Sequence, residues 1–80
     1  MMRTRNPVAV SLDVRRLPSP LPVAKVAVAM ARLQPGELVE VLATGRGAAR
    51  DFAVWSRATG NELLEQGEEA GTFRFVIRRR

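Results

Sequence analysis

The residues best placed to do chemistry are Ser19 and the prolines around it, in the stretch 17–22, which reads Leu-Pro-Ser-Pro-Leu-Pro. A proline sets φ near the helical value and has no N–H group, so it is tolerated in the first turn of a helix and excluded further in. The spacing predicts a helix with Ser19 at its N-cap, Pro20 at the first helical position and Pro22 at the third. The Ser19 hydroxyl would then accept a hydrogen bond from an unpaired backbone N–H. Helix starts that follow strands commonly bind anions or present reactive groups, so this is the first candidate site.

The composition limits what Ser19 could do. The sequence contains no histidine and no cysteine, so it lacks the usual general base near neutral pH, a thiol nucleophile and the common zinc ligands. A serine hydroxyl with no activating base is a weak nucleophile. We therefore expect no metal, no cofactor and no intrinsic catalysis. On residue chemistry alone, Ser19 is a plain N-cap.

A second candidate site is the segment 45–50, which reads Gly-Arg-Gly-Ala-Ala-Arg and lies between a strand and a helix. It resembles a truncated dinucleotide fingerprint, but Arg50 stands in the place of the third glycine and the βαβ unit is too short. A tight turn is the simpler interpretation. Alternatively, the N–H groups of Gly45 and Gly47, the helix N-terminus and Arg46 together hold a phosphate or a partner's carboxylate. Arg16, just before the prolines, is interpreted as an exposed charge of the same candidate binding surface.

Positive charge dominates, with a formal net charge of +5. It favours a surface for phosphate or for an acidic protein partner, or else a solvated face with an arginine-rich tail. Acidic residues gather at four positions, which we interpret as a solvated edge: Glu62, Glu65, Glu68 and Glu69.

The elements that must position these residues follow from the apolar periodicity. Alternation predicts strands, and apolar residues three and four apart predict amphipathic helices with buried stripes. In the second helix that stripe consists of Ala48, Phe52 and Trp55, and Asp51 is solvated. Residues 1–7 read as a flexible basic leader and residues 8–79 as one domain. The expected elements are strand 8–14, helix 20–33, strand 37–43, helix 48–58, strand 61–67 and strand 72–79.

This β-α-β-α-β-β order predicts an α+β fold, a two-layer α/β sandwich with two helices on one face of a four-stranded mixed sheet. The last two strands are close enough to form an antiparallel hairpin. A Pro-Gly turn at 35–36 and Gly60 should end the two helices. The longest apolar run, 26–31, is far too short to span a membrane, and no signal-peptide core follows the N-terminus. We therefore expect a cytoplasmic protein.

Residues 12–23 also resemble the signature of the small TusA/SirA-like sulfur-carrier proteins, L-D-x-R-G-L-x-C-P-x-P followed by a helix. Residues 33–37 (Leu-Gln-Pro-Gly-Glu) are similar to the family's M-x-P-G-E, and residues 49–52 (Ala-Arg-Asp-Phe) to its T-R-D-I. Residues 73–78 resemble its last strand. The resemblance covers about residues 8–79 and implies the family's β-α-β-α-β-β two-layer sandwich.

The resemblance also implies a function. Family members carry sulfur as a persulfide on the cysteine of C-P-x-P, accept it from a cysteine desulfurase or a rhodanese-like donor, and pass it on, for example toward thiolation of tRNA. A helix N-terminus stabilises such a thiolate. In this sequence Ser19 stands at that position, Arg16 replaces the family's glycine, and residues 44–46 replace an acidic loop.

Three interpretations of this departure remain open. The first is a docking or regulatory member that binds a cysteine desulfurase or another sulfur-relay protein but carries no sulfur. The second is an active carrier present here as a Cys-to-Ser variant. The third is a scaffold reused to bind RNA, such as tRNA, or phosphate through its arginines.

Overall fold

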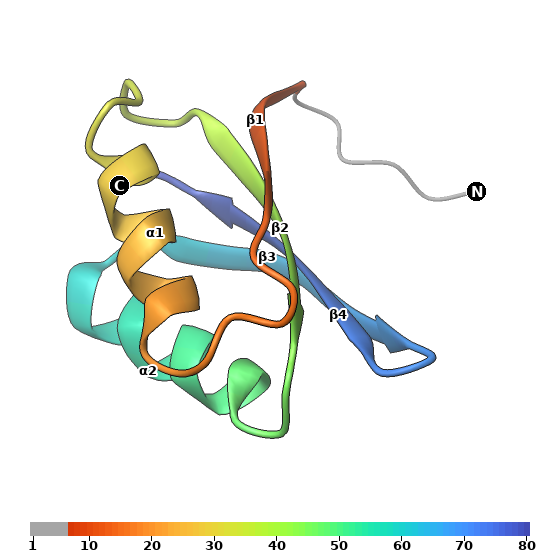
Figure 1. Cartoon of the computed structure of the whole chain (residues 1–80). Helices are drawn as coiled ribbons and strands as arrows, with labels where there is room; N and C mark the ends of the chain where they lie inside the picture. Colours follow the sequence, from red (N-terminus) through yellow and green to blue (C-terminus); the bar gives the residue numbers. More distant parts are fainter. Residues whose placement is uncertain (1–6) are drawn as a thin grey trace.

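The computed structural model describes residues 7–80, so the expected basic leader lies, apart from Pro7, outside the described residues. The order of elements is the predicted β-α-β-α-β-β, with each boundary within a few residues of its expected place (Figure 1). The elements are β1 (Val8–Asp13), α1 (Leu21–Met30), β2 (Leu38–Thr44), α2 (Ala48–Thr59), β3 (Glu62–Glu69) and β4 (Thr72–Arg78).

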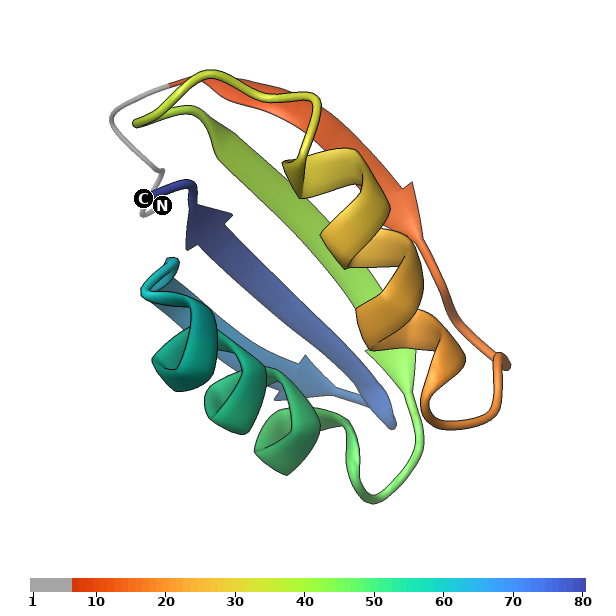
Figure 2. The ribbon, with the colours of Figure 1, turned by 90° about the vertical axis from the view of Figure 1, so that its left-hand side faces the viewer.

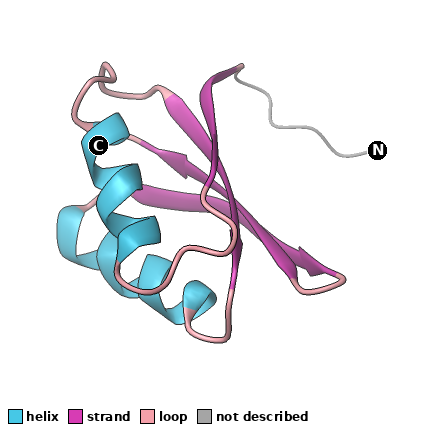
Figure 3. Cartoon of the chain, in the orientation of Figure 1, coloured by secondary structure: helices cyan, strands magenta, loops and turns pink. Residues whose placement is uncertain are grey.

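The four strands form one mixed sheet in the order β1-β2-β4-β3. Strands β1 and β2 are parallel, whereas β4 is antiparallel to both of its neighbours, so β2 and β3 run in the same direction with β4 between them. Strands β3 and β4 form the predicted hairpin, closed at Ala70 and Gly71, which both have positive φ. Both helices cover the same face of the sheet (Figures 2 and 3), which confirms the two-layer α+β fold.

Glycines with positive φ stand where the chain returns from each helix to the sheet, but only Gly60 ends a helix. The prediction that the Pro-Gly turn ends the first helix is wrong, because α1 already ends at Met30 with Ala31 as its C-cap. After α1, Gly36 follows Pro35 in a turn with φ of +90°, and its N–H donates to the Arg79 carbonyl at 2.8 Å. Gly60 ends α2 with φ of +80°, and its N–H donates to the Ser56 carbonyl at 2.9 Å. An L-residue with a side chain rarely adopts these φ values, so glycine fixes where the chain turns back to the sheet.

The core lies between the helices and the sheet. Phe52 of α2 packs on Phe75 of β4 with ring centroids 4.9 Å apart, and both side chains are fully buried. The prediction that Trp55 belongs to the buried stripe is only half right, because its indole is half-buried and meets Phe52 edge-on. Ser56 is the buried residue there, and its hydroxyl has no hydrogen-bond partner within the described part of the chain.

The helix-free face of the sheet carries a polar network that crosses all four strands. The Ser11 hydroxyl of β1 donates to Glu40 of β2 at 2.8 Å, Arg74 of β4 donates to Glu40 at 2.6 Å, and Arg74 also donates to Glu65 of β3 at 3.0 Å. The hydrogen bonds from Arg74 and Ser11 lower the pKa of Glu40. Val76, on the same face, is 0% exposed. The network therefore lies over apolar side chains of the sheet.

These contacts correct the interpretation of the acidic residues as a solvated edge for Glu65, which is half-buried. Glu65 belongs to the cross-strand network, and Glu62 forms an ion pair with Arg78 of the neighbouring strand. The register of β3 against β4 places Glu62 opposite Arg78 and Glu65 opposite Val76, from where the Glu65 side chain reaches Arg74. Sequence spacing alone does not reveal these pairings. Glu62, despite its ion pair, and Glu68 and Glu69 near the hairpin turn are exposed, as the prediction states.

Candidate functional site

The start of α1 differs from the prediction in a way that changes the role of Ser19. Pro20, not Ser19, is the N-cap residue, and no side chain caps the helix. An N-cap hydroxyl accepts a bond from the N–H two or three residues later. For Ser19 these would be Leu21, whose N–H already donates to the Pro18 carbonyl at 2.9 Å, and Pro22, which has no N–H. The predicted capping role of Ser19 is therefore wrong.

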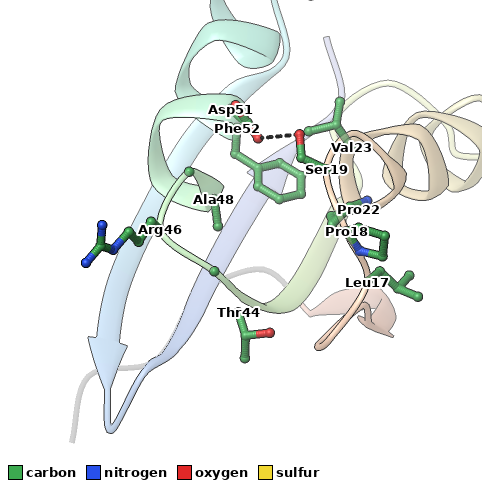
Figure 4. A pocket seen from close by; sticks show the side chains of 12 residues that line it. Leu17, Pro18, Ser19, Pro22, Val23, Thr44, Arg46, Ala48, Asp51 and Phe52 are labelled. Carbon is green, nitrogen blue, oxygen red and sulfur yellow. Dashed lines mark hydrogen bonds between the residues drawn. The ribbon is translucent and has the colours of Figure 1, made fainter.

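The Ser19 hydroxyl instead donates to the Asp51 carboxylate of α2, with an Oγ–Oδ2 distance of 3.2 Å (Figure 4). Asp51 lies in the first turn of α2, where a negative charge interacts favourably with the helix dipole. One hydrogen bond thus joins the segment before α1 to the start of α2. The prediction that Asp51 is solvated is incorrect, because Asp51 is half-buried and accepts the hydrogen bond from Ser19.

Ser19 lies on the rim of a pocket of about 240 Å³ between two chain segments, 17–23 and 44–52. The Phe52 ring points toward the space between them (Figure 4). Pro22, predicted to belong to the site, is buried and lines the pocket, whereas Pro20 is exposed and does not. The lining consists of Leu17, Pro18, Ser19, Pro22, Val23, Thr44, Gly45, Arg46, Gly47, Ala48, Asp51 and Phe52.

The glycine loop of the second candidate site contributes backbone but little positive charge to this pocket. Gly45 has φ of +108°, and its carbonyl accepts a hydrogen bond from the Ala48 N–H at 3.2 Å. The Arg46 side chain projects away from Ser19 (Figure 4), and Arg50 does not line the pocket. With the Asp51 carboxylate beside Gly47, this end of the pocket disfavours a phosphate. Gly45 and Gly47 both line the pocket.

Arg16 is exposed, as predicted, and its backbone is left-handed, with φ of 68°. Its N–H donates to the Thr44 hydroxyl at 2.8 Å, which ties the end of β1 to the end of β2. Next to it, the hydrogen bond from the Arg15 guanidinium lowers the pKa of Asp13 from 3.8 to about 2. The left-handed backbone explains why a glycine suits this position in the signature that the sequence resembles.

Asp51 is the site residue that sequence reasoning missed. Its partner Ser19 lies 32 positions earlier, so no local periodicity connects the two residues. The available signal was the resemblance of residues 49–52 to T-R-D-I, which places an acid in the first turn of the second helix. Among residues 7–80 no group of three or more potential metal ligands lies together. None of the described helices is long and apolar enough to cross a membrane.

Comparisons with known proteins show the family of this chain. Residues 10–79 match the family model described as Sulfurtransferase TusA. The sulfur carrier protein TusA of Pseudomonas paraeruginosa is 39% identical over 75 residues, which cover 94% of this chain and 95% of that protein. TusA of Allochromatium vinosum is 37% identical over 68 residues, 85% of this chain and 90% of that protein.

A solved structure supports the same fold. The SirA-like protein of Desulfitobacterium hafniense superimposes with a TM-score of 0.77 at 21% identity, covering 86% of this chain and 95% of that protein. The family model matches most of the chain, and the relatives are more than 30% identical to it, so the family is established. The chain belongs to the TusA family of sulfur carrier proteins, with a serine where the family's signature has its cysteine.

Proposed function

We propose that this chain is a docking or regulatory protein of a cytoplasmic sulfur relay and carries no persulfide itself. The observation that carries the proposal is Ser19, an alcohol at the pocket rim whose hydroxyl is hydrogen-bonded to Asp51. The expected partner is a cysteine desulfurase or another sulfur-relay protein, since the relatives are named sulfur carriers.

The chemistry of sulfur transfer supports the absence of a carrier role. A thiolate acceptor attacks the terminal sulfur of a donor persulfide, a new S–S bond forms, and the donor's S–S bond breaks with its electron pair leaving on the donor thiolate. A hydroxyl is not ionised near neutral pH and has no sulfur with which to form the new S–S bond. The sequence has no cysteine that could replace it.

A small apolar surface beside the pocket supports the docking role. Leu21 is 44% exposed and lies two residues after Ser19, beside the exposed Pro18 and Pro20. Three neighbouring apolar side chains in a stiff segment form a surface that a partner protein can bury at little cost in conformational entropy. This surface depends on the shape of the segment and not on the presence of a thiol.

One observation favours the second interpretation, an active carrier present as a variant. Serine and cysteine have nearly the same shape, so a cysteine at position 19 would lie at the same exposed rim, two residues before the first helical residue. Such a chain would recover sulfur transfer from a single substitution. This alternative and the docking role predict the same contacts with a sulfur donor. They differ in whether the natural residue at position 19 is a cysteine or a serine.

The experiment measures binding of the unaltered protein to a purified cysteine desulfurase by isothermal titration calorimetry. We expect a complex that is retained in Ser19→Cys and weakened about tenfold in Leu21→Asp, which adds a charge to the apolar surface beside the pocket. Val28→Asp is the matched control, because Val28 is 59% exposed on the same helix, two turns from Leu21. If the unaltered protein does not bind, or if both aspartate variants lose affinity equally, the proposal is wrong.

A further inference from the structure

Among the described residues, the arginines of β4 and of the segment after β1 differ in their partners from those in and just before α2. In β4 and after β1, Arg74, Arg78 and Arg15 each form ion pairs with carboxylates. Arg50 and Arg57 of α2 have no ion pair and no side-chain hydrogen bond within the described residues. The same holds for Arg46 in the loop before α2. The positive charge of the second group is therefore available to something outside the chain.

The unpaired arginines share one side of α2. Arg50 and Arg57 are seven residues apart, which is close to two helical turns, so they point the same way about 10 Å from one another. Val54 lies between them and is 57% exposed. Arg46 precedes the helix, and its side chain projects outward (Figure 4). We call this surface, formed by Arg46, Arg50, Val54 and Arg57, the arginine face.

The opposite side of α2 is occupied, so the arginine face cannot turn inward. Ala48, Phe52 and Ser56 are buried against the sheet and α1. Asp51 is the only acid of the helix, and its carboxylate is directed at Ser19. One side of the helix is thus buried, and its acid is hydrogen-bonded to Ser19 at the pocket. The charged side chains on the outer side, around the exposed Val54, are all positive.

We propose that the arginine face docks an acidic surface of a partner protein. Guanidinium groups form paired hydrogen bonds with carboxylates, and positive charge with no internal partner steers a negatively charged protein into contact. Val54 would be covered at the centre of the contact, where interfaces are most apolar. This inference rests on the proposed docking role and deepens it by giving the chemistry of the partner.

Two features favour a protein over RNA as the occupant. Proteins that bind single-stranded nucleic acid stack bases on exposed aromatic rings. Within residues 7–80, Phe52 and Phe75 are buried, and Trp55 and Phe73 pack against the core. An exposed valine between two arginines suits an apolar side chain of a protein better than a sugar-phosphate backbone. Because the face begins at the loop that lines the Ser19 pocket, a protein bound to it would lie next to that pocket.

The experiment compares two double variants that remove the same charge. Arg50→Gln with Arg57→Gln removes the two arginines of the arginine face that belong to α2 and leaves Arg46 in place. Lys25→Gln with Arg32→Gln removes two exposed cations that belong to α1 and the turn after it and that also lack ion pairs in the described chain. The probes are a short peptide of alternating glutamate and leucine and a single-stranded RNA of equal net charge. Amide chemical shifts report where each probe binds, and titration gives the dissociation constant.

We expect the peptide to shift the amides of α2 and to bind the arginine-face variant about tenfold more weakly, with the control variant within about threefold of the unaltered protein. Equal losses in the two variants would mean that only net charge matters, and tighter binding of the RNA would mean that the face recognises nucleic acid. Either result overturns the inference.

The same variants separate this inference from the proposed function. If the desulfurase binds the unaltered protein and the arginine-face variant equally well, the docking role stands and the arginine face is not its interface. If the desulfurase does not bind at all while the peptide still shifts α2, the docking role in sulfur relay fails and the acidic-partner surface stands.

Discussion

Removal of the Ser19 hydroxyl should destabilise the fold only through the lost bond to Asp51, because no backbone N–H depends on that hydroxyl. A hydrogen bond to a charged group typically contributes about 1.5–3 kcal/mol. Ser19 is exposed, and its Oγ–Oδ2 distance of 3.2 Å is long for a hydroxyl donor. Solvent screening and this geometry reduce the coupling that we expect to about 1 kcal/mol.

A double-mutant cycle measures this coupling from urea unfolding of the unaltered protein, Ser19→Ala, Asp51→Ala and the double variant. Asp51→Ala also removes a favourable charge from the first turn of α2, worth about 0.3–1 kcal/mol, but this contribution cancels in the cycle. With a urea slope of about 1 kcal/mol per molar, the midpoint of the double variant should lie about 1 M above the value expected from additivity.

The control cycle pairs Asp51→Ala with Ser11→Ala, which removes a hydroxyl on the opposite face of the sheet. These two effects should add to within about 0.3–0.5 kcal/mol. If instead Ser19→Ala costs about 0.5–2 kcal/mol whether or not Asp51 is present, the hydroxyl caps α1. The description of the pocket as two segments joined by Ser19 and Asp51 would then be refuted.

Three further predictions follow from other parts of the structure. Arg16→Gly should raise the free energy of unfolding by about 1 kcal/mol, because glycine adopts φ of 68° without strain; an unchanged or lower value in urea unfolding would contradict this. Ser56→Ala should also stabilise by about 1 kcal/mol, since it removes a buried hydroxyl with no described partner, and a fall in the thermal midpoint would disprove it. Asp13 has a pKa lowered from 3.8 to about 2 by Arg15, so its stabilising contribution is present above pH 3.8 and is lost as the pH falls toward 2. Asp13→Asn should therefore show a flatter loss of stability over that range in acid titrations followed by circular dichroism, and identical curves for the two proteins would show that the pair contributes nothing.

The sequence was sufficient for the elements and layers of the fold. Alternating apolar residues located the strands, the prolines located the start of α1, and Gly36 and Gly60 located the turns with positive φ. These signals are local, because φ preferences and side-chain periodicity act over a few residues. The placement of β4 between β2 and β3 was not visible, since it depends on which surfaces pack once the helices have formed.

The candidate site was less predictable, because its contacts join residues far apart in the chain. The prolines correctly indicated a stiff helix start. Ser19 does not cap the helix, however, because the Leu21 N–H already donates to the Pro18 carbonyl. Its contact with Asp51 depends on how α1 and α2 pack on the sheet. In the same way, the pairing of Glu65 with Arg74 depends on how the strands are arranged in the sheet. The sequence pattern therefore wrongly predicted that Glu65 lies on a solvated edge.

The proposed docking role requires that a sulfur donor still recognises the pocket although Ser19, Arg16 and residues 44–46 depart from the family's signature. The most direct test incubates Ser19→Cys and the unaltered protein with a persulfidated cysteine desulfurase and measures the intact mass of each chain, with circular dichroism to confirm that the variant is folded. We predict that the variant gains a sulfur atom, released on reduction, and that the unaltered protein gains none. A folded variant that remains unloaded, or an unaltered protein that gains sulfur, would contradict the claim.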